Sequence, residues 1–205
     1  MRAQAWPARL DDGALGVRPL RLYDARRWII ARRGSADWLS PWEVTVPGQG
    51  GTPPAGWSTF VVTLGRLRRD AEAGNSLPFA VTLQGRLVGQ VTVGNLGREP
   101  REPAYVGYWI DRSQAGRGIT PRALALVLDH AFVTLDLPRV EANIQPDNLA
   151  SRRVVDKLGF RLDGLRPGHL HVAGAWRDHL RYELTREDAR GGLLARTPPV
   201  RASDR

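Results

Sequence analysis

A strand, a loop with two glycines and a helix follow one another in the middle of the chain, and this order constrains the fold more than any other feature. Residues 104–110 (AYVGYWI) have the pattern of a strand. Beyond the loop, apolar residues recur at helical spacing at positions 124, 127, 128 and 131. A chain with this unit is predicted to form an α/β sheet with the loop at a helix N-terminus.

The loop itself predicts an anion site. Gly116 and Gly118 let phosphate oxygens approach the backbone without a Cβ atom in the way. Thr120 is expected to cap the helix and Pro121 to take its first position, so that the amides of residues 116–120 point together at an anion. Neither common phosphate-loop signature fits, because there is no Gly-Lys-Ser/Thr and proline breaks the Gly-x-Gly-x-x-Gly spacing.

The rest of the chain alternates strands and helices in the pattern of one mixed α/β domain. Further strands are predicted near residues 16–20, 78–83, 86–93, 139–144 and 176–184, with Gln84-Gly85 as a hairpin turn. Helices are predicted at 24–33 with Asp24 as cap, from Ser58 as cap, and before Gly159, which fits the left-handed position after a helix. The segment 38–43 is expected to break the first helix.

Several classes of protein are excluded by composition. The chain has no cysteine, which rules out disulfides, thiolate zinc sites and a cysteine nucleophile. Its four histidines are scattered, so no metal is expected. No stretch approaches the roughly 20 apolar residues of a membrane helix, and the first residues lack the apolar run of a signal peptide. A cytoplasmic protein without a membrane partner is expected.

The net charge of +9 is compatible with an acidic partner, such as nucleic acid or a polyphosphate-bearing ligand, and equally with a basic solvated surface. Arg117 and Arg122 are expected to add charge beside the loop. Residues 187–205 contain Gly-Gly and Pro-Pro and are predicted to be a flexible basic tail. The expected division is an N-terminal extension at 1–15, one domain at 16–186 and this tail.

Four ordered motifs resemble the GNAT superfamily of N-acetyltransferases. They are GYWID at 107–111, AGRGIT at 115–120, Pro146-Asp147-Asn148 followed by Ser151, and KLGF at 157–160. Within that superfamily, residues 38–43 (WLSPWE) and 174–179 (GAWRDH) resemble the RimJ/RimL group, which acetylates the α-amino groups of ribosomal proteins. The resemblance covers roughly residues 16–186.

The resemblance implies a mixed, mostly antiparallel sheet flanked by helices, with a V-shaped splay between the fourth and fifth strands. It implies acetyl-CoA as donor, with its pantetheine arm in that splay. The residues implied to contact the donor are Trp109, Ile110, Ala115, Gly116, Arg117, Gly118, Ile119, Thr120, Asn148 and Ser151. Among these, backbone amides around Trp109 and Ile110 would polarise the thioester carbonyl. Asn148 equally fits a plain helix N-cap.

Three side chains are catalytic candidates. Ser151 matches the position that stabilises the leaving thiolate. Tyr108 would line the thioester pocket, although an aromatic pair in a strand also fits core packing. Glu43 is the first candidate for the general base, because the strand at 104–110 lacks the carboxylate that some members of the superfamily carry there. Asp178 and His179 are alternatives for the base.

Four further residues are candidates for the site. Trp38 and Trp42 lie in the irregular segment that flanks Glu43 and would either line the acceptor site or pack in the core. Arg152 and Arg153 follow Ser151 on its helix and would face either phosphates of the donor or solvent. Ala115 replaces the Gln or Arg that usually opens the pyrophosphate signature.

The expected acceptor is a protein N-terminus, of a ribosomal protein in particular, with nucleic-acid binding as a secondary property and a monomer or homodimer as the assembly. Two other functions stay open. A sibling enzyme would acetylate a small amine or an aminoglycoside. A catalytically inactive acyl-CoA-binding or nucleic-acid-associated module would fit the net charge, Ala115 and the missing strand carboxylate, although Asn148, Ser151 and the glycine loop argue against it.

Overall fold

Eight strands of the computed structural model form a single sheet in the order β1-β2-β3-β4-β5-β6-β8-β7, within the described residues 6–48, 51–96 and 103–200. The strands are β1 (Leu10–Asp12), β2 (Leu15–Arg18), β3 (Ser76–Leu83), β4 (Arg86–Gly94), β5 (Ala104–Ile110), β6 (Arg139–Ile144), β7 (Arg161–Val172) and β8 (Ala175–Thr185). All neighbouring strands are antiparallel except β5 and β6. The predicted mixed, mostly antiparallel sheet is confirmed.

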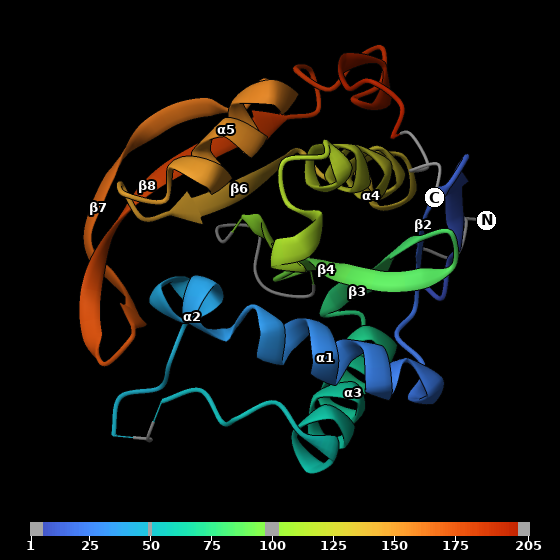
Figure 1. Cartoon of the computed structure of the whole chain (residues 1–205). Coiled ribbons are helices and arrows are strands. Elements are labelled where there is room, and N and C mark those ends of the chain that lie inside the picture. The colour runs from blue at the N-terminus through green and yellow to red at the C-terminus, as the bar shows by residue number, and fades with distance from the viewer. Residues whose placement is uncertain (1–5, 49–50, 97–102, 201–205) are drawn as a thin grey trace.

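Helices cover both faces of the sheet (Figure 1). On one face lie α4 (Ile119–Leu135) and α5 (Leu149–Leu158), and on the other lie α1 (Ala25–Gly34), α2 (Ala36–Leu39) and α3 (Trp57–Glu72). Each face has its own hydrophobic cluster, a large one that includes most of α4 and a smaller one around Trp28 and Phe60. Because α4 is apolar on nearly every side, it is the central helix of the larger cluster.

The sheet opens between β5 and β6. The two strands pair only at Ala104 with Val140 and at Tyr105 with Glu141, although β5 continues to Ile110 and β6 to Ile144. Parallel neighbours that stop pairing after two residues leave their remaining backbone groups without a strand partner. These are the fourth and fifth strands expected from the sequence, so the predicted V-shaped splay is confirmed.

The predicted hairpin is also confirmed, as β3 and β4. Its turn residues Gln84 and Gly85 have φ values of 49° and 75°. Two positive φ angles are what a type I′ turn requires between twisted strands. At the other end of the domain Gly159 has φ 82° and ends α5 in the left-handed conformation, as expected.

Two expected helix caps are wrong. Helix α3 begins at Trp57 after Gly56, so Ser58 lies inside its first turn. Helix α4 begins at Ile119, because Gly118 takes the preceding position with φ 76°. Thr120 is therefore the second residue of the helix and not its cap.

The first helix differs in a similar way. Asp24 does stand before α1, but its carboxylate binds the guanidinium of Arg18 at 2.7 and 2.8 Å and the backbone N–H of Arg21 at 2.8 Å. After α1 the chain turns at Ser35 into the short helix α2 and a 3-10 turn at Ser40–Trp42. The segment expected to break the helix is thus itself mostly helical.

The two ends of the described chain pack onto the domain. Strand β1 adds to the sheet edge within the expected extension. Residues 187–200, expected to be a flexible tail, instead cross α4: Leu193 is fully buried, and its N–H donates to the carboxylate of Asp129 at 2.8 Å. Residues 201–205 of the expected tail lie outside the described residues.

One buried arginine joins these ends. Arg122, on the first turn of α4, forms an ion pair with Asp12 and hydrogen bonds with Thr197. It is only 6% exposed, and these partners from the two chain ends occupy its guanidinium. The expectation that Arg122 adds charge to the loop is therefore wrong.

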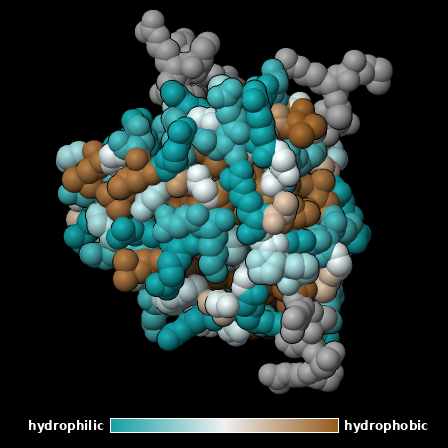
Figure 2. Space-filling view, turned by 90° about the horizontal axis from the view of Figure 1, so that it is seen from above, coloured by the Kyte–Doolittle hydropathy of each residue, from teal (hydrophilic) through white to brown (hydrophobic). Residues whose placement is uncertain are grey.

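The outer surface over α4, α5 and the C-terminal segment is mainly hydrophilic, with small separate hydrophobic areas (Figure 2). None of the described helices is long and apolar enough to span a membrane. The described residues also include no group of three or more His, Asp or Glu side chains arranged to hold a metal ion.

Candidate active site

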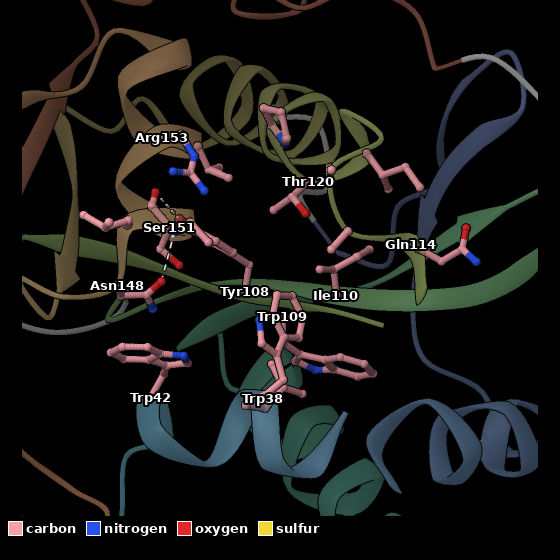
Figure 3. Close-up of a pocket in the computed structure, with 18 of the residues that line it drawn as sticks. Trp38, Trp42, Tyr108, Trp109, Ile110, Gln114, Thr120, Asn148, Ser151 and Arg153 are labelled. Atoms are coloured by element: carbon pink, nitrogen blue, oxygen red, sulfur yellow. Dashed lines mark hydrogen bonds between the residues drawn. The ribbon is translucent and has the colours of Figure 1, made fainter. Parts of the chain in front are cut away.

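A cavity of about 500 Å³ lies at the opened edge of β5, between α4, α5 and α2 (Figure 3). The loop before α4, the end of β5, the start of α5 and the short helix α2 all contribute walls. Of the residues expected to contact a donor, the ones that line it are Trp109, Ile110, Ala115, Gly116, Gly118, Ile119, Thr120, Asn148 and Ser151. We call this space the donor cavity. Tyr108 lines it as well.

The glycine loop has the geometry of an anion cradle. Gly116 and Gly118 have φ values of 78° and 76°, and a Cβ atom on either would meet nothing within 4 Å. The first hydrogen bond of α4 runs from the N–H of Arg122 to the carbonyl of Gly118 at 3.4 Å, and no side chain caps the helix. The amides of the first turn are therefore without helical partners and lie at a positive helix end beside the cavity. These observations fit a pyrophosphate group.

The end of β5 supplies further backbone donors. The N–H of Asp111 donates to the carbonyl of Val88 on β4 at 2.7 Å, so the peptide group of Asp111 faces β4. Since alternate residues of a strand face opposite neighbours, the peptide groups of Tyr108 and Ile110 face the open edge. The amide of Trp109 faces β4, so the amides at the open edge belong to its two neighbours.

Tyr108 and Ser151 meet across the donor cavity. The Tyr108 hydroxyl donates to the carbonyl oxygen of Ser151 at 3.1 Å (Figure 3). Burial raises the pKa of the Tyr108 phenol well above its usual value, which keeps the phenol protonated. Asn148 caps α5 by accepting a hydrogen bond from the Ser151 N–H at 3.1 Å, as its N-cap interpretation predicts. The Ser151 hydroxyl makes no hydrogen bond within the described part of the chain.

Basic side chains line the donor cavity from α5 rather than from the loop. Arg153 and Lys157, one helical turn apart, both face it. Arg117 does not line it, and its guanidinium binds the side chain of Gln114. Arg152 lies away from the cavity, with hydrogen bonds to the Tyr182 hydroxyl at 3.1 Å and the Pro146 carbonyl at 3.0 Å.

A second cavity, of about 610 Å³, adjoins the first on the α1 and α3 side of the sheet. Trp109 lines both cavities, and Tyr108, its neighbour along the strand, lines only the donor cavity. Glu43 lies in the second cavity and forms an ion pair with Arg32. The guanidinium carbon of Arg32 is 5.2 Å from the centroid of the Trp109 ring. We call this space the acceptor-side cavity.

Some expected site residues lie elsewhere. Trp38 and Trp42 line the donor cavity and not the acceptor-side cavity. Asp178 and His179 line neither, because the Asp178 carboxylate accepts a hydrogen bond from the Gly168 N–H and His179 bonds the Arg177 carbonyl within the β7–β8 hairpin. Both alternatives for the base thereby lose their geometric support.

Sequence reasoning missed several lining residues. Gln114 directly precedes the AGRGIT motif, and Lys157 is the first residue of the KLGF motif. Their positions in the loop and on the helix would have been enough to predict both. Trp28, Arg32, Arg66 and Gln90 in the acceptor-side cavity come from α1, α3 and β4. No local sequence signal links residues from three separate elements.

Comparison with known proteins places the chain in a family. The acetyltransferase (GNAT) domain family matches residues 14–161. The solved structure of Mycobacterium smegmatis RimJ, in complex with CoA-disulfide, is 37% identical, covers 94% of each chain and has a TM-score of 0.85. Ribosomal protein uS5-alanine N-acetyltransferase of Escherichia coli is 28% identical over 91% of this chain and 95% of that protein. The probable N-acetyltransferase YjcK of Bacillus subtilis is 39% identical, but the match spans 46% of this chain and about half, 52%, of that relative. This chain belongs to the GNAT acetyltransferase family and to its RimJ/RimL-like group.

Proposed function

We propose that the protein transfers an acetyl group from acetyl-CoA to the α-amino group at the N-terminus of a ribosomal protein. The observation that carries the proposal is the pair of adjoining cavities, which share Trp109 as a wall. A donor and an acceptor can then approach one reaction centre from opposite faces of β5, as direct attack in a ternary complex requires. The similarity to RimJ and to uS5-alanine N-acetyltransferase supports the choice of acceptor.

The donor cavity suits the parts of acetyl-CoA in order. The uncapped N-terminus of α4, with Gly116 and Gly118, would hold the pyrophosphate. Arg153 and Lys157 would attract the remaining phosphate charge. At the end of β5 the Ile110 N–H would donate to the thioester carbonyl oxygen and stabilise the negative charge that develops on it.

The amine must lose a proton as its nitrogen forms a bond to the acetyl carbon. An α-amino group has a pKa near 8, so about a tenth is neutral at pH 7, against well under a thousandth for a lysine side chain. Glu43 is the only carboxylate among the described residues that line the acceptor-side cavity. We assign it the role of proton acceptor, directly or through one water molecule.

The carbon–sulfur bond then breaks, and the departing thiolate needs a proton or a hydrogen bond. The Tyr108 phenol already donates to the Ser151 carbonyl oxygen. The Ser151 hydroxyl has no such partner within the described residues and is the better placed donor to the sulfur. We therefore assign Ser151 to the leaving group and Tyr108 to holding the α5 backbone beside it.

Charge argues against a small polycationic amine as the acceptor. The acceptor-side cavity presents two guanidinium groups, of Arg32 and Arg66, against the single carboxylate of Glu43 among its described walls. An aminoglycoside or a polyamine would bring further positive charge into this space. A peptide N-terminus brings only the single charge of its α-amino group.

Mass spectrometry after incubation with acetyl-CoA tests the proposal. The acceptors would be peptides that begin with Ala, Ser, Thr or Met, a blocked peptide with one internal lysine, an aminoglycoside and spermidine. We expect acetylation of α-amines, with Ala- or Ser-initiated peptides preferred. Reaction of the small amines alone would refute the proposed acceptor, and CoA binding without any transfer would refute the catalytic assignment.

A further inference from the structure

One positively charged side chain of the acceptor-side cavity, that of Arg66, has no acidic partner among the described walls. Helix α3 turns Thr59, Val62, Thr63 and Arg66 toward it, a spacing that places all four on one helical face. Helix α1 contributes Trp28 and Arg32, one turn apart. The two arginines therefore reach the same space from two different helices.

The partners of the two arginines differ. Arg32 forms the ion pair with Glu43 and lies over the rings of Trp28 and Trp109, with its guanidinium carbon 5.8 and 5.2 Å from their centroids. Arg66 is exposed and makes no ion pair or hydrogen bond with any described residue. With Glu43 engaged by Arg32, the described walls offer Arg66 no carboxylate.

We infer that Arg66 selects acceptors that carry a carboxylate close to the reacting amine, and that this carboxylate is an acidic side chain at position 2, 3 or 4 of the acceptor peptide. A guanidinium recognises a carboxylate with two parallel N–H donors, which gives direction as well as attraction. The inference rests on the proposed function, because it requires a peptide N-terminus in this cavity.

The size of the cavity sets how near the carboxylate must be. A volume of about 610 Å³ corresponds to a cube with an edge of about 8.5 Å, which spans about two to three residues of extended chain at about 3.5 Å each. With the amine at the Trp109 end, side chains of the first few residues lie inside or at the mouth. We therefore expect an acidic residue farther along the peptide to lie outside the cavity and out of reach of Arg66.

Matched peptides test the inference. Each begins with Ala and differs only in Glu or Gln at position 2, 3, 4 or 8, and kcat/KM is measured at low ionic strength. For wild type we expect a preference of about three- to fivefold for Glu at position 2, 3 or 4, with none at position 8. The preference should shrink in 0.5 M NaCl because salt screens exposed charges.

Three variants assign the preference to one side chain. Arg66→Gln is expected to abolish the Glu preference, so that the ratio of kcat/KM for each Glu peptide to that for its Gln partner falls to about one. Arg66→Lys should retain part of it, because the charge remains without the bidentate geometry. Arg68→Gln removes an exposed charge of the same helix that does not line the cavity, and should leave the preference intact.

The outcomes separate this inference from the proposed function. Equal rates for Glu and Gln peptides with wild type, or a preference that survives in Arg66→Gln, would overturn the inference while N-terminal acetylation stands. Failure to acetylate any α-amine would overturn both. If Arg68→Gln loses the Glu preference as fully as Arg66→Gln does, the preference comes from the overall positive charge of the helix. That result would also overturn the assignment to Arg66.

Discussion

The phenol of Tyr108 on β5 donates a hydrogen bond to the carbonyl oxygen of Ser151 on α5, 3.1 Å away. This bond crosses the donor cavity where β5 and β6 separate, so it ties β5 to α5 at the level where the two strands no longer pair. The Ser151 backbone is held on both sides, since Asn148 accepts a hydrogen bond from its N–H. Its hydroxyl is therefore presented from a fixed position.

Replacing Ser151 with Ala should lower kcat by about a hundredfold, within the range for loss of a general acid, while the Kd for CoA changes less than about twofold. The substitution keeps the backbone N–H that Asn148 binds, so α5 should retain its cap. Turnover and calorimetric CoA affinity, measured side by side, check this. Ser151→Thr keeps a hydroxyl and should recover part of kcat, and wild-type turnover in Ser151→Ala would remove Ser151 from the reaction.

The Tyr108 phenol gives a pH dependence of stability with a definite sign. Burial raises its folded-state pKa, so above about pH 10 the unfolded chain loses this proton while the folded chain keeps it. The free energy of unfolding should therefore fall between pH 9.5 and 11 more steeply for wild type than for Tyr108→Phe. Urea unfolding at both pH values measures the difference. Parallel curves would contradict the raised pKa.

Gly118→Val should weaken CoA binding by about tenfold or more. A side chain at φ 76° is strained by about 1–2 kcal/mol, and the open space before the loop would be filled. Gly13→Val is the matched control, because Gly13 has φ 61°, meets nothing within 4 Å and lies in the β1–β2 turn. Both variants should lose stability on heating, but only the first should lose CoA affinity. Equal CoA affinities would show that the loop is not the pyrophosphate site.

Glu43→Gln should reduce kcat/KM by about tenfold at pH 7, with the deficit shrinking toward pH 9. The reason is that an α-amine with pKa near 8 is mostly neutral by pH 9, so that removal of its ammonium proton before the attack no longer limits the rate. The pH profile of kcat/KM on one Ala-initiated peptide checks this. Glu72→Gln, an exposed change at the end of α3, serves as the control. A deficit that stays constant with pH would assign Glu43 to binding alone.

Asp12→Ala should destabilise the fold by about 3 kcal/mol at pH 7, because Arg122 would be left buried without its counter-charge. The Arg122 guanidinium lowers the pKa of the Asp12 carboxyl below its ordinary 3.8. Its stabilising contribution is therefore complete well above that pH and declines as pH falls from 3.8 through the lowered value. The difference in free energy of unfolding between wild type and Asp12→Ala, measured by urea titration, should therefore be smaller near pH 3 than at pH 7. The neighbouring Asp11→Ala, which breaks only an exposed pair with Arg9, should cost about 1 kcal/mol or less.

The sequence predicts well those parts of the fold that have local chemical signals. Strand β5, the glycine loop and the end of α5 at Gly159 all follow from spacing or from a conformational need of glycine. Strand β7 was missed because half of its residues are exposed and only one is buried, so that its sequence shows no alternation. The packing of Leu193 was missed because the short apolar run after Gly-Gly, residues 193–195, gives no periodicity, and its partner Asp129 lies 64 residues earlier.

The same limit applies to the site. The donor cavity is built largely from contiguous motifs, so most of its lining could be predicted. The acceptor-side cavity joins α1, α3, β4 and β5, and the ion pair of Glu43 with Arg32 becomes visible only once the sheet has brought these elements together. For this reason the sequence suggested Glu43 but not the arginine that holds it.

The position of Arg122 also orders events during synthesis. The ribosome releases Asp12 first, Arg122 more than a hundred residues later, and Thr197 later still. The first turn of α4, which would hold the pyrophosphate, can complete its support only when residue 197 has emerged from the exit tunnel. A nascent chain that already contains every motif of the donor cavity therefore lacks the hydrogen bonds between Arg122 and Thr197 until the segment around residue 197 has been synthesised.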